Sequence, residues 1–426
     1  MAFERSQAQI LGQWLAEPPD RIIIVAGPRR VGKSYMVNQL LKKYPLDAYH
    51  FVAVDDPNAM DLNIDLLNDA TAHRLGITPT AAWLTEIWKK ARIKAQELSL
   101  KQPNPFVLVI DEIQKIPQWS EVVKGLWDSD RRTNLRMHVV LLGSSPWLMQ
   151  KGLTESLLGR YEQIHMTHWS YQEMQTAFDL NLNEYVYFGG YPGPISRMQD
   201  ESRWKNEIRN AYIEPYIHSD ILQMARIHKP VLLENLFKLG TAFSGQILAY
   251  DKMLGQLHDA GNTTTLAGYQ QLLSKAELLA GLMNYTPQEI GRRKSPPKWQ
   301  VYNTAFISAL SDYSFTEAQA DRTYWGRLIE STVGAHLINT ISSEDRLFYW
   351  REGKDNQSPE VDFILLSKDK LLALEIKSGP QKFPGGLHAF MRKYPKAKAV
   401  YIGDGGISIA EFLSQAASIW VKEWSQ

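Results

Sequence analysis

Apolar runs recur in the first part of the chain and alternate with segments in which apolar residues have helical spacing. Runs without internal alternation are typical of strands buried on both faces of a parallel sheet. The predicted strands are residues 22–25, 49–54, 106–110, 138–142 and 161–166, and the predicted helices are residues 7–16, 35–43, 81–99 and 122–128. This order predicts a doubly wound α/β domain with a parallel sheet, which we assign to residues 1–177.

The segment 178–297 is mostly helical by pattern. Two short predicted helices, 250–257 and 265–274, flank a turn, with Thr263 or Thr264 as the N-cap, and the apolar run 278–284 follows. This order predicts a winged-helix-like domain. It either contacts DNA through exposed polar side chains, or packs on its neighbours as a coupling element. The side chains that would contact DNA are Thr263, Thr264, Gln270 and Gln271.

A basic, proline-rich run ends this segment at residues 292–298, from Arg292 to Lys298. It is either a wing that contacts phosphates or a solvated linker. The rest of the chain, 298–426, has a predicted helix at 327–340, strands at 360–366 and 371–377, a helix at 387–394 and a strand at 399–402. We expect a mixed α/β domain there.

Composition narrows the function classes. The net charge of +1 means that any nucleic-acid surface must be local, and the lack of cysteine excludes disulfides, cysteine zinc sites and thiol catalysis. The N-terminus lacks a signal-peptide pattern, and no apolar stretch approaches the roughly 20 residues that span a bilayer. We therefore expect a cytoplasmic protein without a membrane segment.

A glycine-rich loop between the first predicted strand and the next helix fits G-x-x-x-x-G-K-[ST] in full. Strand, loop and helix are the context in which backbone N–H groups and a helix N-terminus bind phosphate. Lys33 would contact the β- and γ-phosphates, and the Ser34 hydroxyl would contact Mg²⁺. The sequence thus predicts binding of ATP and Mg²⁺. The predicted nucleotide-binding residues are Gly27, Pro28, Arg29, Arg30, Val31, Gly32, Lys33 and Ser34.

Three further positions complete the predicted ATP site. Asp111 and Glu112 end the strand 106–110, where Asp111 would hold Mg²⁺ through its water shell and Glu112 would polarise the attacking water. Ser144 or Ser145 would sense the γ-phosphate, unless this pair caps the helix that follows. Arg160 would complete the site in cis or across a subunit interface, the alternative being a solvated arginine at a helix end.

Taken together, these motifs resemble the archaeal and bacterial AAA-like P-loop ATPases that often carry a C-terminal restriction-endonuclease-type domain of unknown function. The resemblance rests on residues 27–34, 109–119, 141–145 and 157–161, with support from 188–193 and 219–221. It implies nucleotide binding and hydrolysis, and it implies no single biological role.

The C-terminal segment is similar to the nuclease pattern of a helical acid, an aspartate and then Glu-x-Lys. Glu330, Asp362, Glu375 and Lys377 occupy these positions. The resemblance implies that Asp362 and Glu375 hold Mg²⁺ while Lys377 orients a water or stabilises charge on phosphorus. Residues 378–403 contain five cations and no acid, as a nucleic-acid backbone would require. The alternatives are an incidental Glu-Ile-Lys strand and an inactive binding module.

Our leading hypothesis is an ATPase coupled to a nuclease-like domain that acts on or near DNA. The rival is a nucleotide-dependent switch that senses a protein partner through an inactive C-terminal docking domain. A third hypothesis is a nucleic-acid-binding scaffold with slow ATP turnover. Assembly into a homo-oligomer is compatible with each.

Overall fold

The computed structural model describes residues 3–55, 79–102, 104–144, 149, 156–221, 227–257, 261–287, 295–353, 358–368, 370–377 and 385–425. The chain forms two compact units, Met1–Met166 and Thr167–Gln426. The middle and C-terminal segments that we separated at residue 297 lie together in the second unit. The division into three domains therefore stays a prediction.

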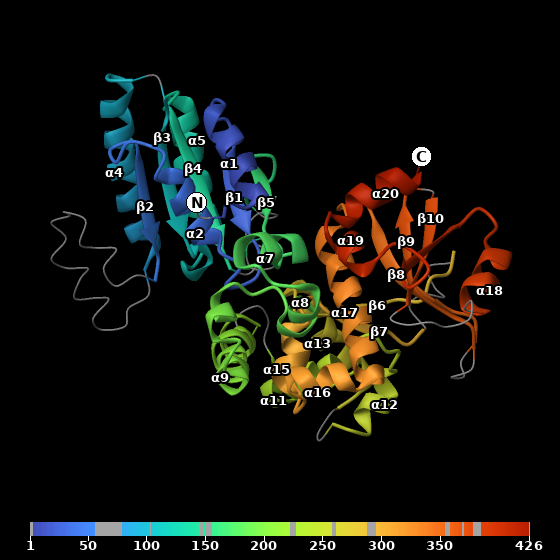
Figure 1. Ribbon diagram of the computed structural model, residues 1–426. Helices are drawn as coiled ribbons and strands as arrows, with labels where there is room; N and C mark the ends of the chain where they lie inside the picture. Colours follow the sequence, from blue (N-terminus) through green and yellow to red (C-terminus); the bar gives the residue numbers. More distant parts are fainter. Residues whose placement is uncertain are drawn as a thin grey trace. The chain divides into compact units, whose positions relative to one another are not determined.

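The first unit is built on a five-stranded parallel sheet of order β2-β3-β4-β1-β5 (Figure 1). The predicted parallel α/β architecture is confirmed. The strands are β1 (Ile22–Ala26), β2 (Tyr49–Ala53), β3 (Phe106–Asp111), β4 (Met137–Gly143) and β5 (Tyr161–His165). The helices are α1 (Ser6–Ala16), α2 (Lys33–Leu41), α4 (Ala81–Ser99) and α5 (Trp119–Arg132), with a short 3-10 helix η1 (Ile113–Lys115).

The three central strands of this sheet are buried along their whole length. Alternate residues of β1, β3 and β4 form one hydrophobic core with α4 and α5, and the residues between them face the other side of the sheet. Helix α1 packs on α2 and β5. Helices on the sheet explain why these strands are continuous apolar runs.

Strand register decides which loops meet. Ala26 at the end of β1 pairs with Gly143 at the end of β4, and Ile110 of β3 pairs with Leu141 of β4. The segments that follow β1, β3 and β4 therefore share one edge of the sheet. Arg160 lies at the opposite edge, because it directly precedes β5, whose first residue Tyr161 pairs with Ile22.

The second unit begins with short helical segments and continues into a helical region with a two-stranded hairpin. Its first helices are α7 (Tyr171–Phe178), α8 (Leu182–Phe188), the 3-10 helix η2 (Gly193–Arg197), α9 (Glu201–Glu207) and the π-helices η3 (Ile208–Ile213) and η4 (Tyr216–Ile221). They are followed by α11 (Pro230–Ala242), α12 (Tyr250–Leu254), α13 (Thr263–Lys275), β6 (Leu279–Leu282), β7 (Lys298–Val301), α15 (Ala305–Leu310), α16 (Phe315–Ala320) and α17 (Arg322–Thr340).

The structure corrects two details of the predicted helix pair. The N-cap of α13 is Asn262, whose side chain accepts a hydrogen bond from the backbone N–H of Thr265 at 2.9 Å, so Thr263 and Thr264 lie inside the helix. Gln270 is buried and accepts a hydrogen bond from the Tyr250 hydroxyl at 3.4 Å. A side chain committed to the core cannot contact DNA.

The second unit ends in a four-stranded sheet of order β11-β10-β9-β8. Strands β8, β9 and β10 are antiparallel, and β10 and β11 are parallel. The elements are β8 (Arg346–Arg351), β9 (Glu360–Ser367), β10 (Lys370–Lys377), α18 (Gly385–Lys393), β11 (Lys398–Gly403), α19 (Ile409–Leu413) and α20 (Ala417–Ser425). Among the helices in the described ranges, none has both the length and the apolar character needed to cross a membrane.

Candidate functional site

The loop between β1 and α2 requires glycine at two positions, for different reasons. A Cβ at Gly27 would lie 2.0 Å from the carbonyl oxygen of Met166, so this position packs directly against backbone. Gly32, which precedes α2, has φ +94°, a conformation that a residue with a side chain rarely adopts. The loop thus leads directly into the N-terminus of α2, where backbone N–H groups lack partners within the helix.

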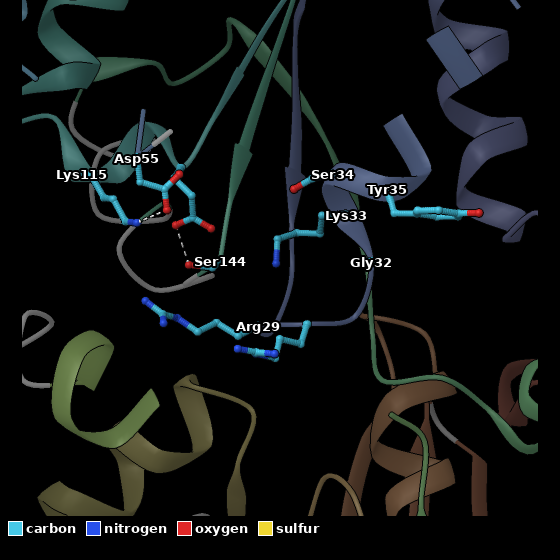
Figure 2. A pocket seen from close by; sticks show the side chains of 10 residues that line it. Arg29, Gly32, Lys33, Ser34, Tyr35, Asp55, Lys115 and Ser144 are labelled. Atoms are coloured by element: carbon cyan, nitrogen blue, oxygen red, sulfur yellow. Dashed lines mark hydrogen bonds and ion pairs between the residues drawn. The ribbon is translucent and has the colours of Figure 1, made fainter. Parts of the chain in front are cut away.

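Lys33 is buried and points back into this loop. Its Nζ donates to the carbonyl oxygens of Gly27 at 3.0 Å and Pro28 at 2.7 Å. Figure 2 shows Lys33 and Ser34 in the pocket, with Tyr35 pointing away from them. The ammonium is therefore held close to where a phosphate bound by the loop would lie.

Ser34 and Asp111 join the loop to the end of β3. The Ser34 hydroxyl donates to Asp111 Oδ2, and the backbone N–H of Glu112 donates to Asp111 Oδ1 at 2.9 Å. Burial raises the pKa of Asp111, although the hydrogen bond from Ser34 opposes that shift. A buried carboxylate beside a hydroxyl is a donor set that suits Mg²⁺, and a bound cation would favour its charged form. These two residues fit the predicted metal site.

Glu112 lies next to Asp111 with φ 56°, in the left-handed region. Its Oε2 accepts two hydrogen bonds, one from the Ser144 hydroxyl at 2.9 Å and one from Gln114 Nε2 at 2.6 Å. Gln114 Nε2 also lies 3.2 Å from Ser144 Oγ. Ser144 therefore contacts Glu112, because β3 and β4 are neighbouring strands and these residues follow their ends. Ser145 lies outside the described residues.

Gln114 was missed by sequence reasoning. It lies two positions after Glu112 in the single turn of η1, which brings its amide back to the glutamate. In an extended strand these two side chains would also share a face, but their Cα atoms would be about 6.6 Å apart and the side chains would not meet as they do in the turn. The glutamine in Asp-Glu-Ile-Gln was the available signal.

Lys33, Ser34, Glu112 and Ser144 line a pocket of about 270 Å³, whereas Asp111 and Gln114 lie behind its wall. Figure 2 also shows an ion pair on its wall, in which Lys115 Nζ lies 2.6 Å from Asp55 Oδ2. Of the predicted loop residues, Gly27, Pro28 and Val31 are buried and do not line the pocket. The lining residues are Arg29, Arg30, Gly32, Lys33, Ser34, Tyr35, Asp55, Glu112, Lys115 and Ser144.

Arg160 is not brought to this pocket. Its guanidinium forms a two-point ion pair with Asp128, with Nε 2.8 Å from Oδ1 and Nη2 3.1 Å from Oδ2. This pair lies at the edge of the sheet opposite the loop, where β5 begins. Arg160 therefore does not contribute to the ATP site of its own chain in this structure.

The N-terminal part of the chain, which carries this pocket, matches a known protein family. Residues 19–175 match the family described as AAA domain. The N-terminal part of the chain is an AAA-like P-loop ATPase domain. Residues 179–317 and 325–419 match two families described only as domains of unknown function, DUF8612 and DUF4143. The ATPase domain thus accounts for the pocket, and the family matches assign no activity to the rest.

Two curated relatives are uncharacterised. MJ1544 of Methanocaldococcus jannaschii is 24% identical over 374 residues, which are 83% of this chain and 74% of the relative. A protein of Haemophilus influenzae is 23% identical over 369 residues, which are 84% of this chain and 82% of the relative. The similarity extends well beyond the ATPase domain in both cases.

Solved structures align only loosely. The Walker-type ATPase PABY2304 of Pyrococcus abyssi aligns with a TM-score of 0.46 at 14% identity, over 73% of this chain and 96% of that one. RuvB of Thermotoga maritima aligns with a TM-score of 0.29 at 16% identity, over 66% and 87% of the two chains. TM-scores this low do not establish a shared fold.

The four predicted nuclease residues lie on three elements of the second unit. Glu330 is on α17, Asp362 on β9, and Glu375 and Lys377 on β10. The backbone N–H of Ile376 donates to Asp362 Oδ2 at 2.8 Å, and Lys377 Nζ lies 3.4 Å from Glu375 Oε1. Burial, followed by the negative charge of Asp362, raises the pKa of Glu375 to about 8. The structure thus brings these acids together.

Lys298 and Glu360 also belong to this cluster, and neither was predicted from the sequence to do so. Lys298 Nζ lies 2.6 Å from Glu330 Oε1, 3.6 Å from Glu360 Oε1 and 3.6 Å from Asp362 Oδ1. Its side chain is 0% exposed, so it is neither a solvated linker residue nor a contact to phosphate. Burial alone would lower the pKa of Lys298, but the three carboxylates outweigh it and the net shift is upward. Its proline-rich, basic neighbourhood wrongly suggested a solvated position.

These residues do not fit the implied nuclease Mg²⁺. An ammonium already faces Asp362 Oδ1, a backbone N–H occupies Oδ2, and Lys377 faces Glu375. Within the described ranges, no group of three or more His, Asp or Glu side chains could hold a metal ion. Lys298 and Lys377 already pair with acids of the cluster, where a bound Mg²⁺ would need their oxygens.

The basic patch predicted after β10 is partly engaged in other contacts. Lys393 Nζ lies 3.3 Å from Glu352 Oε1, and Lys398 Nζ donates to the carbonyl oxygen of Trp424 at 3.1 Å. Lys382 lies outside the described residues, as do Arg292, Arg293 and Lys294 of the earlier basic run. The nucleic-acid surface therefore stays a prediction.

Proposed function

We propose that the chain binds ATP with Mg²⁺ in the pocket of its ATPase domain and hydrolyses it. The observation that carries the proposal is that Lys33, the Ser34–Asp111 pair and the Glu112 carboxylate converge on one edge of the parallel sheet. This is where α/β sheets bind ligands, because the strands end there and helix N-termini point at the ligand.

Each residue has a distinct role in that reaction. Lys33 exchanges the carbonyl oxygens of Gly27 and Pro28 for the β- and γ-phosphates of ATP, to which its charge is better suited. Ser34 and Asp111 would hold Mg²⁺, which would neutralise charge on the phosphates. Glu112 orients a water and accepts its proton, and Ser144 and Gln114 hold the Glu112 carboxylate in position.

For the second unit we propose the partner-sensing switch, with the C-terminal sheet acting as a docking module. The supporting observation is Lys298, which neutralises the acids that a nuclease would use for its metal. The nuclease hypothesis keeps one supporting observation, the convergence of Asp362, Glu375 and Lys377. A winged-helix-like role for α12, α13 and the β6–β7 hairpin, with DNA as partner, belongs to the same hypothesis.

One set of assays tests both proposals. ATP hydrolysis is measured with and without DNA or RNA on the wild type, on Lys33→Ala and on Lys42→Ala, an exposed control at the end of α2. We expect hydrolysis to vanish in Lys33→Ala alone. Cleavage of DNA and RNA with Mg²⁺ or Mn²⁺ is scored in parallel on the wild type and Glu375→Gln, and we expect none.

The outcomes separate the hypotheses. Hydrolysis that survives Lys33→Ala contradicts the proposed ATP site. Cleavage that is lost in Glu375→Gln establishes the nuclease and rejects the docking module. Hydrolysis stimulated by nucleic acid without cleavage favours the nucleic-acid-binding scaffold over the partner-sensing switch.

A further inference from the structure

Lys298 is the first residue of β7, and it is completely buried among acids from two other elements. Its Nζ lies 2.6 Å from Glu330 on α17 and 3.6 Å from both Glu360 and Asp362 on β9. It also donates to the main-chain oxygen of Asp362 at 3.1 Å. A single ammonium therefore joins the β6–β7 hairpin to the helix and the strand that carry the predicted nuclease acids.

Burying a charge in this way is costly unless the charge is paired and hydrogen-bonded. Lys298 has both kinds of partner, and its position leaves it no route to solvent. The same argument holds for the acids, which lose solvation and need a cation nearby. Lys298 and the acid cluster stabilise each other, so removing one leaves the other buried without a partner.

The charges around the cluster are nearly balanced without any added ion. The carboxyl groups are Glu330, Glu360, Asp362 and Glu375, and the cations are Lys298, Lys377 and Arg351. Arg351 Nη2 lies 2.9 Å from Glu360 Oε2, and Lys377 Nζ lies 3.4 Å from Glu375 Oε1. A divalent ion entering beside Lys298 would meet a like charge rather than an uncompensated acidic site.

Packing holds the lysine in place. Gln300, two residues along β7, donates to the main-chain oxygen of Ser331 on α17 at 2.8 Å. A Cβ at Gly334 would lie 2.1 Å from Gln300 Oε1, so strand and helix are in close contact. Tyr349 on β8 donates to the main-chain oxygen of Pro296, just before β7. The start of the hairpin cannot move away from α17 without breaking these contacts.

We propose that the ε-ammonium of Lys298 is the resident cation of the C-terminal acid cluster, where it fastens the β6–β7 hairpin to α17 and β9 and takes the place of a divalent metal ion. The cluster then acts as a charged joint inside the second unit. This inference goes beyond ATP hydrolysis and does not depend on it.

The test is the response of thermal stability to Mn²⁺ in the full chain. Every variant carries Asp111→Asn, so that the metal site of the ATPase domain does not contribute. Lys298→Met keeps the unbranched shape of the side chain up to Cε and removes its charge, and Lys238→Met removes a lysine from the exposed ion pair with Glu234. We expect no Mn²⁺ response with Lys298 present, and a Tm lower by about 5 °C or more in Lys298→Met.

Two further results follow if the joint exists. Mn²⁺ at millimolar concentration restores part of the Tm lost in Lys298→Met, because it replaces the missing cation. Adding Glu330→Gln to Lys298→Met also restores part of it, because it removes an acid left without its partner. Lys238→Met changes neither Tm nor the Mn²⁺ response, as expected of an exposed pair.

Contrary results are equally clear. An increase in Tm with Mn²⁺ in the protein that retains Lys298 overturns the proposal, because a divalent ion then binds beside the lysine. The proposal is also overturned if the Tm loss of the Lys298→Met, Glu330→Gln double variant equals the sum of the losses of the two single variants, since the two charges are then uncoupled. If Lys298→Met does not fold, the Mn²⁺ titration of the protein that retains Lys298 still decides, and folding of the double variant would by itself show that the two charges are coupled.

Discussion

At the scale of single residues, the carboxylate of Glu112 depends on two neighbours. Ser144 and Gln114 donate to the same oxygen, Oε2, from the ends of β4 and η1 respectively. Gln114 Oε1 is buried and has no hydrogen-bond partner among the described residues. The glutamine is therefore committed to the glutamate through its amide nitrogen, and we interpret it as a positioning residue.

Gln114→Ala is expected to lower kcat for ATP hydrolysis by about 10- to 100-fold, because a misplaced general base loses most of its contribution. The Kd for ATP is expected to stay unchanged, since Gln114 does not line the pocket. Steady-state kinetics and nucleotide titration measure the two quantities. Gln96→Ala, on the exposed face of α4, is the control. A raised Kd with unchanged kcat would assign Gln114 to binding instead.

His336 on α17 makes stability depend on pH. The ring is buried and is hydrogen-bonded through Nε2 to the carbonyl oxygen of Gln415 at 3.0 Å, so Nε2 carries the proton. Burial lowers its pKa from 6.5 to about 4. The unfolded chain therefore binds a proton between these values while the folded chain does not, and stability is lost as pH falls through that window.

His336→Gln keeps a donor for Gln415 and removes the titration. Between pH 7 and pH 4.5 the wild type is expected to lose about 2 to 3 kcal/mol more than this variant in the free energy of unfolding. Urea unfolding of the second unit at both pH values measures the difference. Equal acid sensitivity in the two proteins would show that His336 is already protonated in the folded state.

At the scale of elements, two glycines of the ATPase domain differ in the space available for a side chain. Gly27 directly follows β1 and packs against backbone, whereas a Cβ at Gly125 on the exposed face of α5 would meet nothing within 4 Å. Gly27→Ala is expected to lower the free energy of unfolding by about 3 kcal/mol through overpacking. Gly125→Ala is expected to raise it by about 0.5 to 1 kcal/mol, because alanine favours the helix.

Chemical denaturation of both variants, monitored in the ATPase domain, measures these two changes. The pair controls for itself, because the same substitution is made at a crowded and at an open position. A neutral effect of Gly27→Ala would mean that the β1 end can move away from Met166. The loop would then be more adaptable than its contact with Met166 indicates.

At the scale of the whole molecule, the ATPase domain places Arg160 and the phosphate loop at opposite edges of its sheet. Arg160 is held by Asp128, far from Lys33 in the strand register. An interface with a second copy of the chain would bring it to a nucleotide, whereas in its own chain it is paired with Asp128. We therefore interpret Arg160 as a residue that would act across a subunit interface, by displacing Asp128 with phosphate.

Mixing two inactive variants tests this interpretation. Lys33→Ala lacks ATP binding but keeps Arg160, and Arg160→Ala binds ATP but lacks the arginine. Each alone is expected to hydrolyse little ATP, and the mixture is expected to exceed the sum of the two. Arg132→Ala, an exposed arginine at the end of α5, is expected to behave as the wild type. Full activity of Arg160→Ala at all protein concentrations would sink the interpretation.

The sequence by itself determined the sheet of the ATPase domain and the position of its phosphate loop. The strands β1, β3 and β4 were predicted to within one residue at each end, because burial on both faces imposes continuous apolar runs that are local in sequence. Lys33, Ser34, Asp111 and Glu112 could likewise be predicted, because strand ends and a glycine-rich loop are also local features. Asp362 and Glu375, two of the three predicted nuclease acids, do lie together, because β9 and β10 form one hairpin.

Only the tertiary structure decided the charges around those residues. The N-cap of α13 is Asn262, one residue from the predicted position, which is a local difference. By contrast, the ion pairs of Lys298, the pair of Arg160 with Asp128 and the contact of Ser144 with Glu112 join segments far apart in the chain. Whether a charge is solvated or buried depends on which distant elements pack around it. A lysine in a proline-rich basic run and a lysine neutralising an acid cluster have the same local sequence, and their surroundings alone separate the two.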